Sequence, residues 1–502
     1  MDYIFDVAVI GGGINGCGAA ADAALRGLSV VLCEQDDLAS QTSSKSTKLI
    51  HGGLRYLELL DFSLVKKSLD ERQKLLQLAP HLISPLSFIL PHQKKMRPFW
   101  MLRTGLFLYD HLSRKNTLPR SKLIRRHAHP DYFSPLTNAF TKALSFYDCM
   151  TDDARLTLAN AIQASEHGAS ILPHTKLIKA EIIDDQWRLT FKPKKSRSFQ
   201  IKAKAVINAA GPWVPDVNQI LAVPLAHSLS LVKGSHIVVN KLYDGDHAYM
   251  LENTDKRMIF AIPYHGFTLI GTTDVVLKDP VDTNTTIDKK ETDYLLRLIK
   301  HCFKKPCKEK DIITSWSGVR PLIAEKGKAS NSLSRDYAIN YTSSPAPAIT
   351  IYGGKITTYR QLSSQTIDAL IPVFPHLKNG QSGHTPLPGS TWKTLGFKEY
   401  QQHAEKKYHW LGKPTLERYL SHYGTRTEHV LAGCKKIDDL GLCFTETLYQ
   451  IEVDYLQQEE WARNIDDILW RRTKLGLTID EAGKKKLQAY LLSCQNGHKA
   501  PI

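Results

Sequence analysis

The chain lacks the cysteine patterns of a disulfide-stapled or zinc-binding protein. Its eight cysteines are scattered over 502 residues, and none forms a Cys-x-x-Cys pair. A chain of this length buries enough apolar surface to fold without disulfides. Cys302 and Cys307 are the closest pair, yet no further ligands stand nearby at the spacing that zinc requires. We therefore expect reduced thiols in a cytosolic protein, and no metal site.

Long apolar runs and a secretory leader are also missing. No segment reaches the roughly eighteen consecutive apolar residues that span a bilayer. Met1 to Asp6 lead directly into a strand-like run, without the basic stretch and cleavage site of a signal peptide. Export is therefore not expected, and any contact with a membrane should be peripheral.

Acidic residues are few relative to basic ones. The chain has 50 Asp and Glu against 66 Lys and Arg, which gives a net charge of +16. Such a charge attracts anionic substrates, anionic lipids or nucleic acid, and does not by itself choose among them. The imbalance is greatest between His92 and His129, where Asp110 is the single acid. Trp100, Phe107 and other apolar residues alternate with the bases there, which indicates either a membrane-facing segment or a basic surface over a buried helix face.

The apolar pattern at the N-terminus predicts a βαβ unit. Residues 5–10, Phe-Asp-Val-Ala-Val-Ile, have the predominantly apolar character of a buried parallel strand. An alanine-rich helix is expected over 14–27, ending at Gly27, and a second strand over 28–33. The crossover between the two strands should be right-handed.

Strand patterns dominate the middle of the chain and helical patterns its end. Helices are predicted over 61–79, over 150–167 and from about Thr357. Strands are predicted over 176–183, 187–191, 203–208, 236–240, 258–263, 268–271 and 348–352. After Pro388-Gly389 the periodicity is helical, for example over 398–408, 413–423 and 455–475.

These patterns predict an α/β fold, α+β overall, in three parts. A Rossmann-like nucleotide-binding domain is expected within 1–388, formed mainly by 1–80, 150–215 and 345–388. An antiparallel-sheet domain that binds substrate is interleaved with it, mainly over 81–149 and 216–344. Residues 389–502 are expected to form a C-terminal helical cap.

A glycine-rich turn lies between the first strand and the first helix. Gly11-Gly12-Gly13-Ile14-Asn15-Gly16 fits G-x-G-x-x-G in the context that a dinucleotide-binding unit requires. The glycines let the backbone approach a pyrophosphate, whose charge is met by amides at the helix N-terminus. Glu34 closes the second strand eighteen residues after Gly16, where a carboxylate accepts hydrogen bonds from ribose hydroxyls.

Two later turns favour FAD over NAD. Asn208-Ala209-Ala210-Gly211-Pro212-Trp213 and Ile351-Tyr352-Gly353-Gly354-Lys355 each follow a predicted strand with small residues that let the chain pass close to a cofactor. The second turn precedes a helix whose positive end suits the pyrimidine carbonyl of a reduced flavin. Three such turns spread from residue 11 to 354 suit the long, extended FAD, whereas one compact half-fold normally serves NAD.

These motifs, together with Ser43-Ser44-Lys45-Ser46-Thr47-Lys48-Leu49-Ile50-His51-Gly52-Gly53-Leu54-Arg55-Tyr56-Leu57-Glu58, resemble the FAD-dependent, respiratory-type glycerol-3-phosphate dehydrogenases. The resemblance extends from Asp6 to about Arg472, in the same order and with similar spacing. Ala210 departs from it, since threonine is expected there, and this puts one hydroxyl contact in doubt. Further matching stretches are Lys233-Gly234-Ser235-His236, Gly271-Thr272-Thr273-Asp274, Ser317-Gly318-Val319-Arg320-Pro321, Arg335-Asp336-Tyr337, Gly353 to Arg360 and Trp470-Arg471-Arg472-Thr473-Lys474.

The resemblance implies an FAD-binding domain of the glutathione-reductase and D-amino-acid-oxidase type. The implied reaction is oxidation of sn-glycerol 3-phosphate to dihydroxyacetone phosphate by hydride transfer to N5 of FAD, with electrons passed to a membrane quinone. It also implies a cytoplasmic protein held peripherally at the inner face of the cytoplasmic membrane, on anionic lipid. No nucleic acid is expected as a partner, and a homodimer is one open option. No calcium loop of the D-x-D-x-D-G type follows the cap, so calcium regulation is not indicated.

Cationic residues in the matching stretches are the candidates for holding the substrate. An arginine fork suits a phosphate or a developing oxyanion because it donates two parallel hydrogen bonds. By motif, Arg320 and Arg335 are assigned to the reacting oxygens. The candidate base is His51 or His236, and each is also open to a structural role. The substrate-binding candidates are Arg55, Tyr56, Thr272, Thr273, Arg320, Arg335 and Lys355.

The resemblance also implies a set of residues around FAD. Most belong to the three turns and to the 43–58 stretch. The set comprises Gly11, Gly13, Ile14, Asn15, Gly16, Glu34, Ser43, Ser44, Lys48, Leu49, His51, Gly52, Gly53, Ala210, Gly211, Trp213, Gly353, Gly354, Lys355, Ile356 and Thr357.

Three other functions stay open at this point. An oxidase of the same substrate would return the electrons to O2 and release peroxide. A flavin-dependent protein that binds or modifies RNA would also suit the high pI, although no RNA-reading motif is present. A non-catalytic scaffold is hard to reconcile with so many polar residues in glycine-turn contexts.

Overall fold

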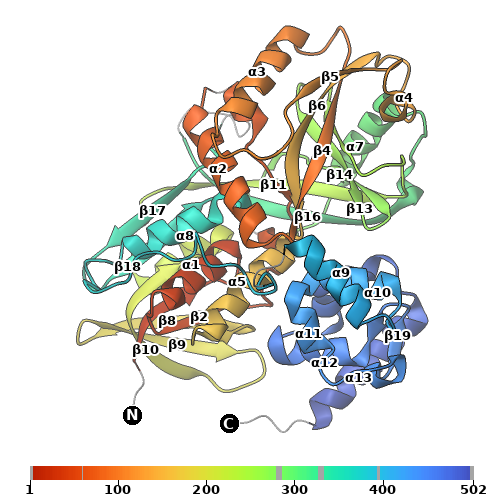
Figure 1. The fold of residues 1–502 in the computed structure, drawn as a ribbon. Coiled ribbons are helices and arrows are strands. Elements are labelled where there is room, and N and C mark those ends of the chain that lie inside the picture. The colour runs from red at the N-terminus through yellow and green to blue at the C-terminus, as the bar shows by residue number, and fades with distance from the viewer. Residues whose placement is uncertain (1–3, 59, 279–284, 326–332, 393–395, 498–502) are drawn as a thin grey trace.

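The computed structural model describes residues 4–58, 60–278, 285–325, 333–392 and 396–497. Within these residues, two large sheets and a C-terminal helical region account for most of the secondary structure (Figure 1). The mixed α/β fold with a helical C-terminal region agrees with the fold class predicted from the sequence. No described helix is both long and apolar enough to cross a bilayer.

The first sheet is parallel at its centre. Val7 to Ile10 of its first strand are buried, as the apolar run predicts. The antiparallel hairpin β8 (Thr175–Ile183) and β9 (Gln186–Pro193) joins the sheet through β10. The strand order is β17 (Tyr337–Thr342), β18 (Ala348–Gly353), β10 (Phe199–Asn208), β1 (Ile4–Ile10), β2 (Val30–Cys33) and β7 (Ser170–Leu172).

Helices cover both faces of this sheet. Helix α1 (Ile14–Leu25) packs between α5 (Asp153–Glu166) and α8 (Tyr359–Asp368). Its row of buried alanines lets these helices approach closely, and the shared core includes Leu158 and Leu362. Helix α6 (Val214–Leu221) and the β8–β9 hairpin form the core with the opposite face.

The second sheet is antiparallel, except where β12 pairs parallel with β4. One face packs on α2 (Phe62–Leu78) and α3 (Phe99–His111), and the other on α7 (Lys289–Cys302) and α4 (Pro130–Phe133). Its main path is β15 (Val275–Val276), β11 (Leu229–Val239), β14 (Phe267–Gly271), β13 (Met258–Tyr264), β12 (Ala248–Glu252), β4 (Ile83–His92), β6 (Lys142–Thr151) and β3 (Leu49–Ile50), with β16 (Ile312–Ile323) on β11 and β5 (Lys122–Arg125) on β6.

The sequence-based division into domains stays a prediction. β3 lies within 1–80 but pairs in the second sheet, and β17 lies within 216–344 but pairs in the first. The chain therefore passes between the sheets at short segments that carry little local pattern of their own.

The C-terminal region has its own buried core. One sequence prediction there was wrong. The helix expected over 455–475 is broken, because α12 ends at Glu459 and Trp461 adopts a left-handed backbone with φ of 56°. The elements of this region are α9 (Phe397–Lys407), α10 (Lys413–Tyr423), α11 (Thr427–Val430), β19 (Cys443–Thr445), β20 (Leu448–Tyr449), α12 (Gln450–Glu459), a π-helix (Asp467–Arg472) and α13 (Glu481–Gly497).

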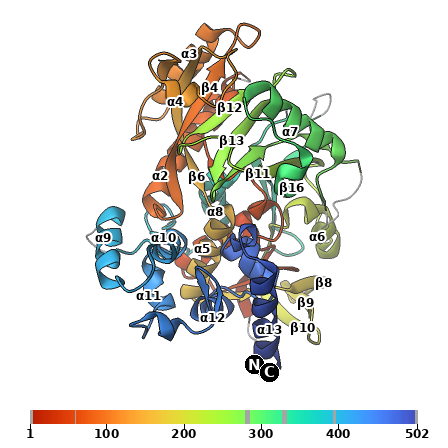
Figure 2. The same cartoon turned by 90° about the vertical axis from the view of Figure 1, so that its right-hand side faces the viewer.

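Buried charges join this region to the first sheet. Both views show it beside α5, at the end of the molecule opposite α3 and α4 (Figures 1 and 2). Arg472 is fully buried and pairs with Asp37, which follows β2 in the chain. Arg155 of α5 pairs in the same way with Glu460. A buried pair that loses one partner is costly, so these contacts fix the position of the cap.

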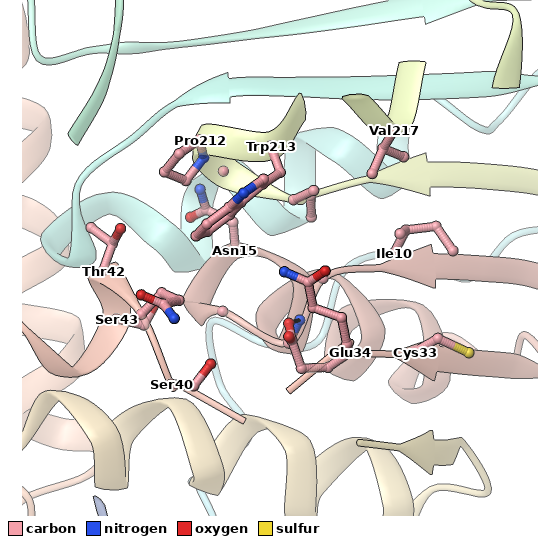
Figure 3. Close-up of a pocket in the computed structure, with 18 of the residues that line it drawn as sticks. Ile10, Asn15, Cys33, Glu34, Ser40, Thr42, Ser43, Pro212, Trp213 and Val217 are labelled. Atoms are coloured by element: carbon pink, nitrogen blue, oxygen red, sulfur yellow. Dashed lines mark hydrogen bonds between the residues drawn. The ribbon is translucent and has the colours of Figure 1, made fainter. Parts of the chain in front are cut away.

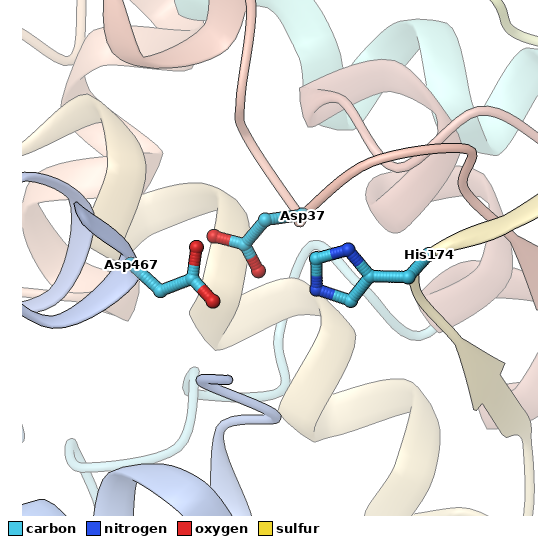
Figure 4. A group of neighbouring side chains, drawn as sticks. All are labelled: Asp37, His174 and Asp467. Atoms are coloured by element: carbon cyan, nitrogen blue, oxygen red, sulfur yellow. The ribbon is translucent and has the colours of Figure 1, made fainter. Parts of the chain in front are cut away.

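Asp37, His174 and Asp467 point toward one another at this junction (Figure 4). Their ligand atoms lie within 4.8 Å of one another, a geometry that a metal ion could use. Both carboxylates, however, already accept hydrogen bonds from Arg471, and Asp37 also accepts them from Arg472. We assign the cluster a role in holding the cap, and the prediction of no metal site stays a prediction.

Candidate active site

The glycine-rich turn leaves no room for side chains. A Cβ on Gly16 would lie 1.9 Å from the Gly11 carbonyl oxygen, and one on Gly11 would lie 2.6 Å from the Ala209 carbonyl oxygen. Gly11 also has φ of 115°, which disfavours any other residue. Helix α1 begins at Ile14, directly after the turn, with its N-terminus at the wall of a cavity.

Glu34 lies across this cavity from Trp213 (Figure 3). Its carboxylate accepts hydrogen bonds from the amides of Gly12 at 2.7 Å and Asp36 at 2.8 Å. Burial raises the pKa of Glu34 to about 7, although the two amides oppose this shift. The carboxylate is therefore held in one place at the end of β2, as ribose recognition requires.

The third glycine turn, which comes much later in the chain, forms another wall of the cavity. Gly353 and Gly354 have φ of 69° and 102°, and both line the cavity. The Asn15 side-chain amide donates to the Gly353 carbonyl at 3.1 Å, which ties this turn to the start of α1. A short 3-10 helix over Ile356–Thr358 then leads into α8.

A second cavity continues from the first toward the antiparallel sheet. The two share five lining residues, Ile14, Thr42, Ser43, Pro321 and Gly354. Their continuity gives an extended space that begins at Glu34 and ends among cationic side chains. This shape suits a long dinucleotide with a further ligand at its end.

Arg320 of β16 lines the second cavity and is fixed by three hydrogen bonds. Its guanidinium donates to Asp274 at 2.6 Å, to the Thr272 hydroxyl at 2.9 Å and to the Thr273 carbonyl at 3.4 Å. A Cβ on Gly234 would lie 2.1 Å from the guanidinium, so that glycine provides its space. An arginine held in this way is preorganised to meet negative charge.

Arg335 and Lys355 complete the cationic end of the cavity. Arg335 lies 3.9 Å from the same Asp274 carboxylate. The Lys355 ammonium lies 3.7 Å from the centre of the Tyr56 ring. Burial lowers the pKa of Lys355 to about 7, with Arg335 adding to the effect and Asp336 opposing it.

Both candidate histidines line this cavity. His236 Nε2 is 3.0 Å from the Thr47 hydroxyl, and its ring stacks on Trp316. Burial, reinforced by Arg320 and Lys48, holds the pKa of His236 well below its usual range. Burial also lowers the pKa of His51, although Asp148 opposes the shift. Both imidazoles are therefore neutral near pH 7 and able to accept a proton.

Comparison with known proteins identifies the type of site. Residues 6–360 match the model of the FAD dependent oxidoreductases, and residues 381–492 match the C-terminal domain of alpha-glycerophosphate oxidase. The chain is 43% identical over 495 residues to a glycerol-3-phosphate dehydrogenase of Pseudomonas aeruginosa, across 98% of this chain and 95% of the relative. The chain belongs to the FAD-dependent glycerol-3-phosphate dehydrogenase family.

Two further relatives bear on cofactor and substrate. A glycerol-3-phosphate dehydrogenase from Bacillus halodurans, solved in complex with FAD, has a TM-score of 0.79 and 27% identity, and covers 99% of this chain and 92% of that one. A D-erythritol 1-phosphate dehydrogenase of Brucella abortus is 41% identical, across 95% of each chain. FAD is the cofactor of this dehydrogenase family, and the glycine turns and Glu34 fit its ADP half.

Most residues predicted to bind FAD line the two cavities. Four do not: Gly16, Ser44, Lys48 and Gly52. Lys48 pairs instead with Asp153 at 2.8 Å, and the Gly52 amide donates to the Tyr109 hydroxyl at 2.7 Å. The 17 that line a cavity are Gly11, Gly13, Ile14, Asn15, Glu34, Ser43, Leu49, His51, Gly53, Ala210, Gly211, Trp213, Gly353, Gly354, Lys355, Ile356 and Thr357.

Two of the predicted substrate residues stand apart from the rest. The Thr273 hydroxyl donates to Glu291 at 2.5 Å and accepts from the Ser235 amide, away from the cavity. Arg55 lies in the 3-10 helix Leu54–Leu57, but its side chain is outside the described part of the structure. Tyr56, Thr272, Arg320, Arg335 and Lys355 all line the second cavity.

Sequence reasoning missed other lining residues. Thr175 to Leu177 lie beside Glu34 at the carboxyl end of the first sheet, where the general rule for open α/β sheets places a ligand. That rule was a usable signal for these residues. Arg257 also lines the second cavity and donates to the Asp274 carbonyl. Nothing in its local sequence distinguishes it from the other basic residues of the chain.

Proposed function

We propose that the chain oxidises the secondary hydroxyl of sn-glycerol 3-phosphate to the ketone of dihydroxyacetone phosphate and passes the electrons to a membrane quinone. The observation that carries the proposal is the cationic end of the second cavity, formed by Arg320, Arg335 and Lys355. It continues directly from the cavity that suits FAD. A small polyol phosphate is the ligand class that such a group of cations holds.

We assign the roles of the substrate residues by motif. Lys355, Tyr56 and Arg55, which precedes Tyr56 in the chain, are assigned to the phosphate or to the pocket wall. Arg320 and Arg335 are assigned to the oxygen on the reacting carbon, whose negative charge grows as the proton leaves. The Thr272 hydroxyl, which accepts a hydrogen bond from Arg320 and donates one to the Thr273 carbonyl, is assigned to orienting that oxygen.

Bound FAD supplies the acceptor, because the flavin ring takes hydride from the carbon that is oxidised. His51 and His236 remain the two candidates for the base. Each is neutral at pH 7 by the direction of its pKa shift, and each lines the cavity. His236 is better placed to pass a proton on, because its Nε2 is within hydrogen-bonding distance of the Thr47 hydroxyl.

Anaerobic mixing tests cofactor and substrate together. Purified protein should carry a flavin absorption band, and sn-glycerol 3-phosphate should bleach it in the absence of oxygen. Glycerol and inorganic phosphate, each added alone, are the controls, because neither offers both the hydroxyl and the ester. A flavoprotein that stays yellow with the substrate would refute the assignment.

D-erythritol 1-phosphate is a second candidate substrate. The relative from Brucella abortus that acts on it is nearly as similar to this chain as the relative from Pseudomonas aeruginosa. The two substrates share the phosphate and differ by one hydroxymethyl group. Comparing kcat/KM for the two decides between them, and we expect the three-carbon ester to be preferred.

The electron acceptor separates a dehydrogenase from an oxidase. We propose a quinone, and with it peripheral attachment to anionic lipid at the inner face of the cytoplasmic membrane. The basic and aromatic residues between His92 and His129 support this. Peroxide yield should be low and quinone reduction fast with vesicle-bound protein. The opposite pattern would make the protein an oxidase, whose C-terminal domain the family model also names.

Two minor predictions accompany the proposal. No nucleic acid partner is expected, which salt-dependent tRNA binding tests. A homodimer is the expected oligomer if the chain associates with itself, and sedimentation of the holoenzyme tests it.

A further inference from the structure

Asp274 places a negative charge at the cationic end of the second cavity. Its side chain is 11% exposed and lines the cavity together with Arg320 and Arg335. The ligand proposed for this cavity is a phosphate ester, which carries about 1.5 to 2 negative charges at pH 7. A carboxylate repels such a ligand, so its presence beside the binding site calls for a physical reason.

One oxygen of Asp274 faces both guanidiniums. Its Oδ1 accepts a hydrogen bond from Arg320 at 2.6 Å and lies 3.9 Å from a terminal nitrogen of Arg335. Arg320 belongs to β16 and Arg335 to the segment before β17, and two like charges repel each other when they are brought together. The carboxylate that they share offsets this repulsion and draws both guanidiniums toward one point.

The backbone that carries Asp274 is held from the buried side of the sheet. The hydroxyl of the preceding residue, Thr273, donates to Glu291 at 2.5 Å and accepts from the Ser235 amide at 2.9 Å. Glu291 is itself buried and forms the capping box at the start of α7. The Asp274 carbonyl also accepts a hydrogen bond from Arg257 at 3.2 Å. The carboxylate therefore has a fixed position from which to orient the arginines.

Arg320 has further contacts that do not depend on this carboxylate. It donates to the Thr272 hydroxyl at 2.9 Å and to the Thr273 carbonyl at 3.4 Å. Loss of the Asp274 charge should therefore leave Arg320 in the cavity with a less precise orientation. We accordingly expect a smaller effect on the reaction than that of removing the arginine itself.

We propose that Asp274 is a positioning residue of the oxidation: its carboxylate holds Arg320 and Arg335 at the oxygen of the reacting carbon, and it lowers the positive charge that the phosphate meets. This assignment rests on the proposed function, which supplies the substrate and the role of the two arginines. The ketone product keeps the phosphate of the substrate, so cations that bind both esters equally strengthen binding without speeding the reaction. Asp274 weakens the binding of both esters and speeds the step between them.

Anaerobic rapid mixing of the holoenzyme separates the two effects. Flavin bleaching at a series of sn-glycerol 3-phosphate concentrations gives the substrate Kd and the limiting rate of reduction, without any electron acceptor. Asp274→Asn keeps the size of the side chain and removes its charge. We expect the Kd to fall about threefold to tenfold, because a repelling charge is gone. The limiting rate should fall about tenfold, because the guanidiniums are less precisely placed. Calorimetry with inorganic phosphate should show a matching gain in affinity.

Asp274→Glu restores the charge but moves it by one methylene group. The Kd should return to within about twofold of the wild type, while the limiting rate stays about tenfold lower. Asp244→Asn is the matched control, because its carboxylate is 96% exposed and pairs only at the surface with Lys241. Both constants should stay within about twofold of the wild type in this control. A role in folding alone would lower flavin content and Tm in both Asp274 variants and give no gain in phosphate affinity.

A limiting rate in Asp274→Asn that stays within about twofold of the wild type overturns the proposal, and so does a phosphate affinity that does not rise. Loss of FAD binding in both Asp274 variants overturns it as well, because the carboxylate would then support the fold. If only Asp274→Asn loses FAD, Asp274→Glu decides, since a lowered rate at unchanged Kd supports the proposal and an unchanged rate overturns it. A wild-type flavin that sn-glycerol 3-phosphate does not reduce contradicts the proposed function instead, and phosphate calorimetry then still tests the charge of Asp274.

Discussion

Glu34 carries a carboxyl group that burial drives toward its neutral form, while two backbone amides hold it as an acceptor. Replacing it with glutamine removes the charge and keeps the shape. We expect Glu34→Gln to weaken FAD binding by about 10- to 100-fold, since a hydrogen bond to a charged group contributes about 1.5–3 kcal/mol. Fluorescence titration of deflavoprotein with FAD measures this.

Asp36→Asn is the matched control for Glu34. Asp36 is the next acid in the chain, and its carboxylate pairs at the surface with Lys194, at 2.5 Å. Its loss should leave FAD affinity within about twofold, because exposed ion pairs contribute little. Equal losses in the two variants would mean that the carboxylate of Glu34 has no specific role in holding the cofactor.

Arg320 acts on the substrate in our proposal and not on the flavin. Arg320→Ala should keep the yellow bound cofactor and lower kcat by about 10²- to 10³-fold, the usual effect of removing a preorganised donor to developing charge. Arg297→Ala, an exposed arginine on α7, is the control for loss of a charge. Near-normal turnover in Arg320→Ala, measured with a dye acceptor, would exclude Arg320 from the site.

Lys355 should give the enzyme a pH dependence near neutrality. Burial lowers its pKa to about 7, so the ammonium is charged below that value and loses its charge above it. If the ammonium holds the phosphate, kcat/KM should fall as the pH rises through about 7. Lys355→Arg stays charged throughout this range and should abolish the fall. A decline that persists unchanged in Lys355→Arg must come from another group.

At the scale of elements, the Asp467–Arg472 π-helix joins the cap to the loop after β2. Burial alone would raise the pKa of Asp37, but Arg472 and Arg471 outweigh it and hold the pKa below its usual range. The contribution of this pair to stability is therefore present at neutral pH and is lost as the pH falls through the folded-state value. Arg472→Met should destabilise the holoenzyme by about 3 kcal/mol, since a buried carboxylate loses a partner.

The double variant Asp37→Asn/Arg472→Met checks this reading of the pair. Removing both charges should restore part of the lost stability, because no isolated charge then stays buried. Thermal unfolding of the three variants at pH 7 gives the comparison. Strictly additive losses would show that the two residues stabilise the fold independently.

Helices and strands whose residues follow one clear pattern were predictable from the sequence. Elements whose pattern is interrupted were not. The βαβ opening was found because β1 is apolar at every position except Asp6 and α1 is rich in alanine. β4 was missed because Pro85 and Pro91 interrupt its pattern. The structure accommodates both prolines, since β12 pairs only with Phe88 and Ile89 between them. The break at Trp461 was missed because a left-handed residue other than glycine leaves no signal.

At the scale of the whole molecule, the sequence motifs were a better guide than individual residues to which side chains line the second cavity. Thr272, Arg320 and Lys355 come from different segments and meet around one cavity. The exceptions are residues whose partners are remote in sequence. Lys48 turns to Asp153 and Thr273 to Glu291, and no local pattern shows that such a side chain will be drawn away from a ligand.

The hydrogen bond from Asn15 to Gly353 joins positions 338 residues apart. The ribosome must therefore extend the chain from the glycine-rich turn as far as Gly353 before the opposite wall of the cavity can form. Nascent chains fold from the N-terminus as they emerge, so the first βαβ segment must wait, partly formed, for its distant neighbour.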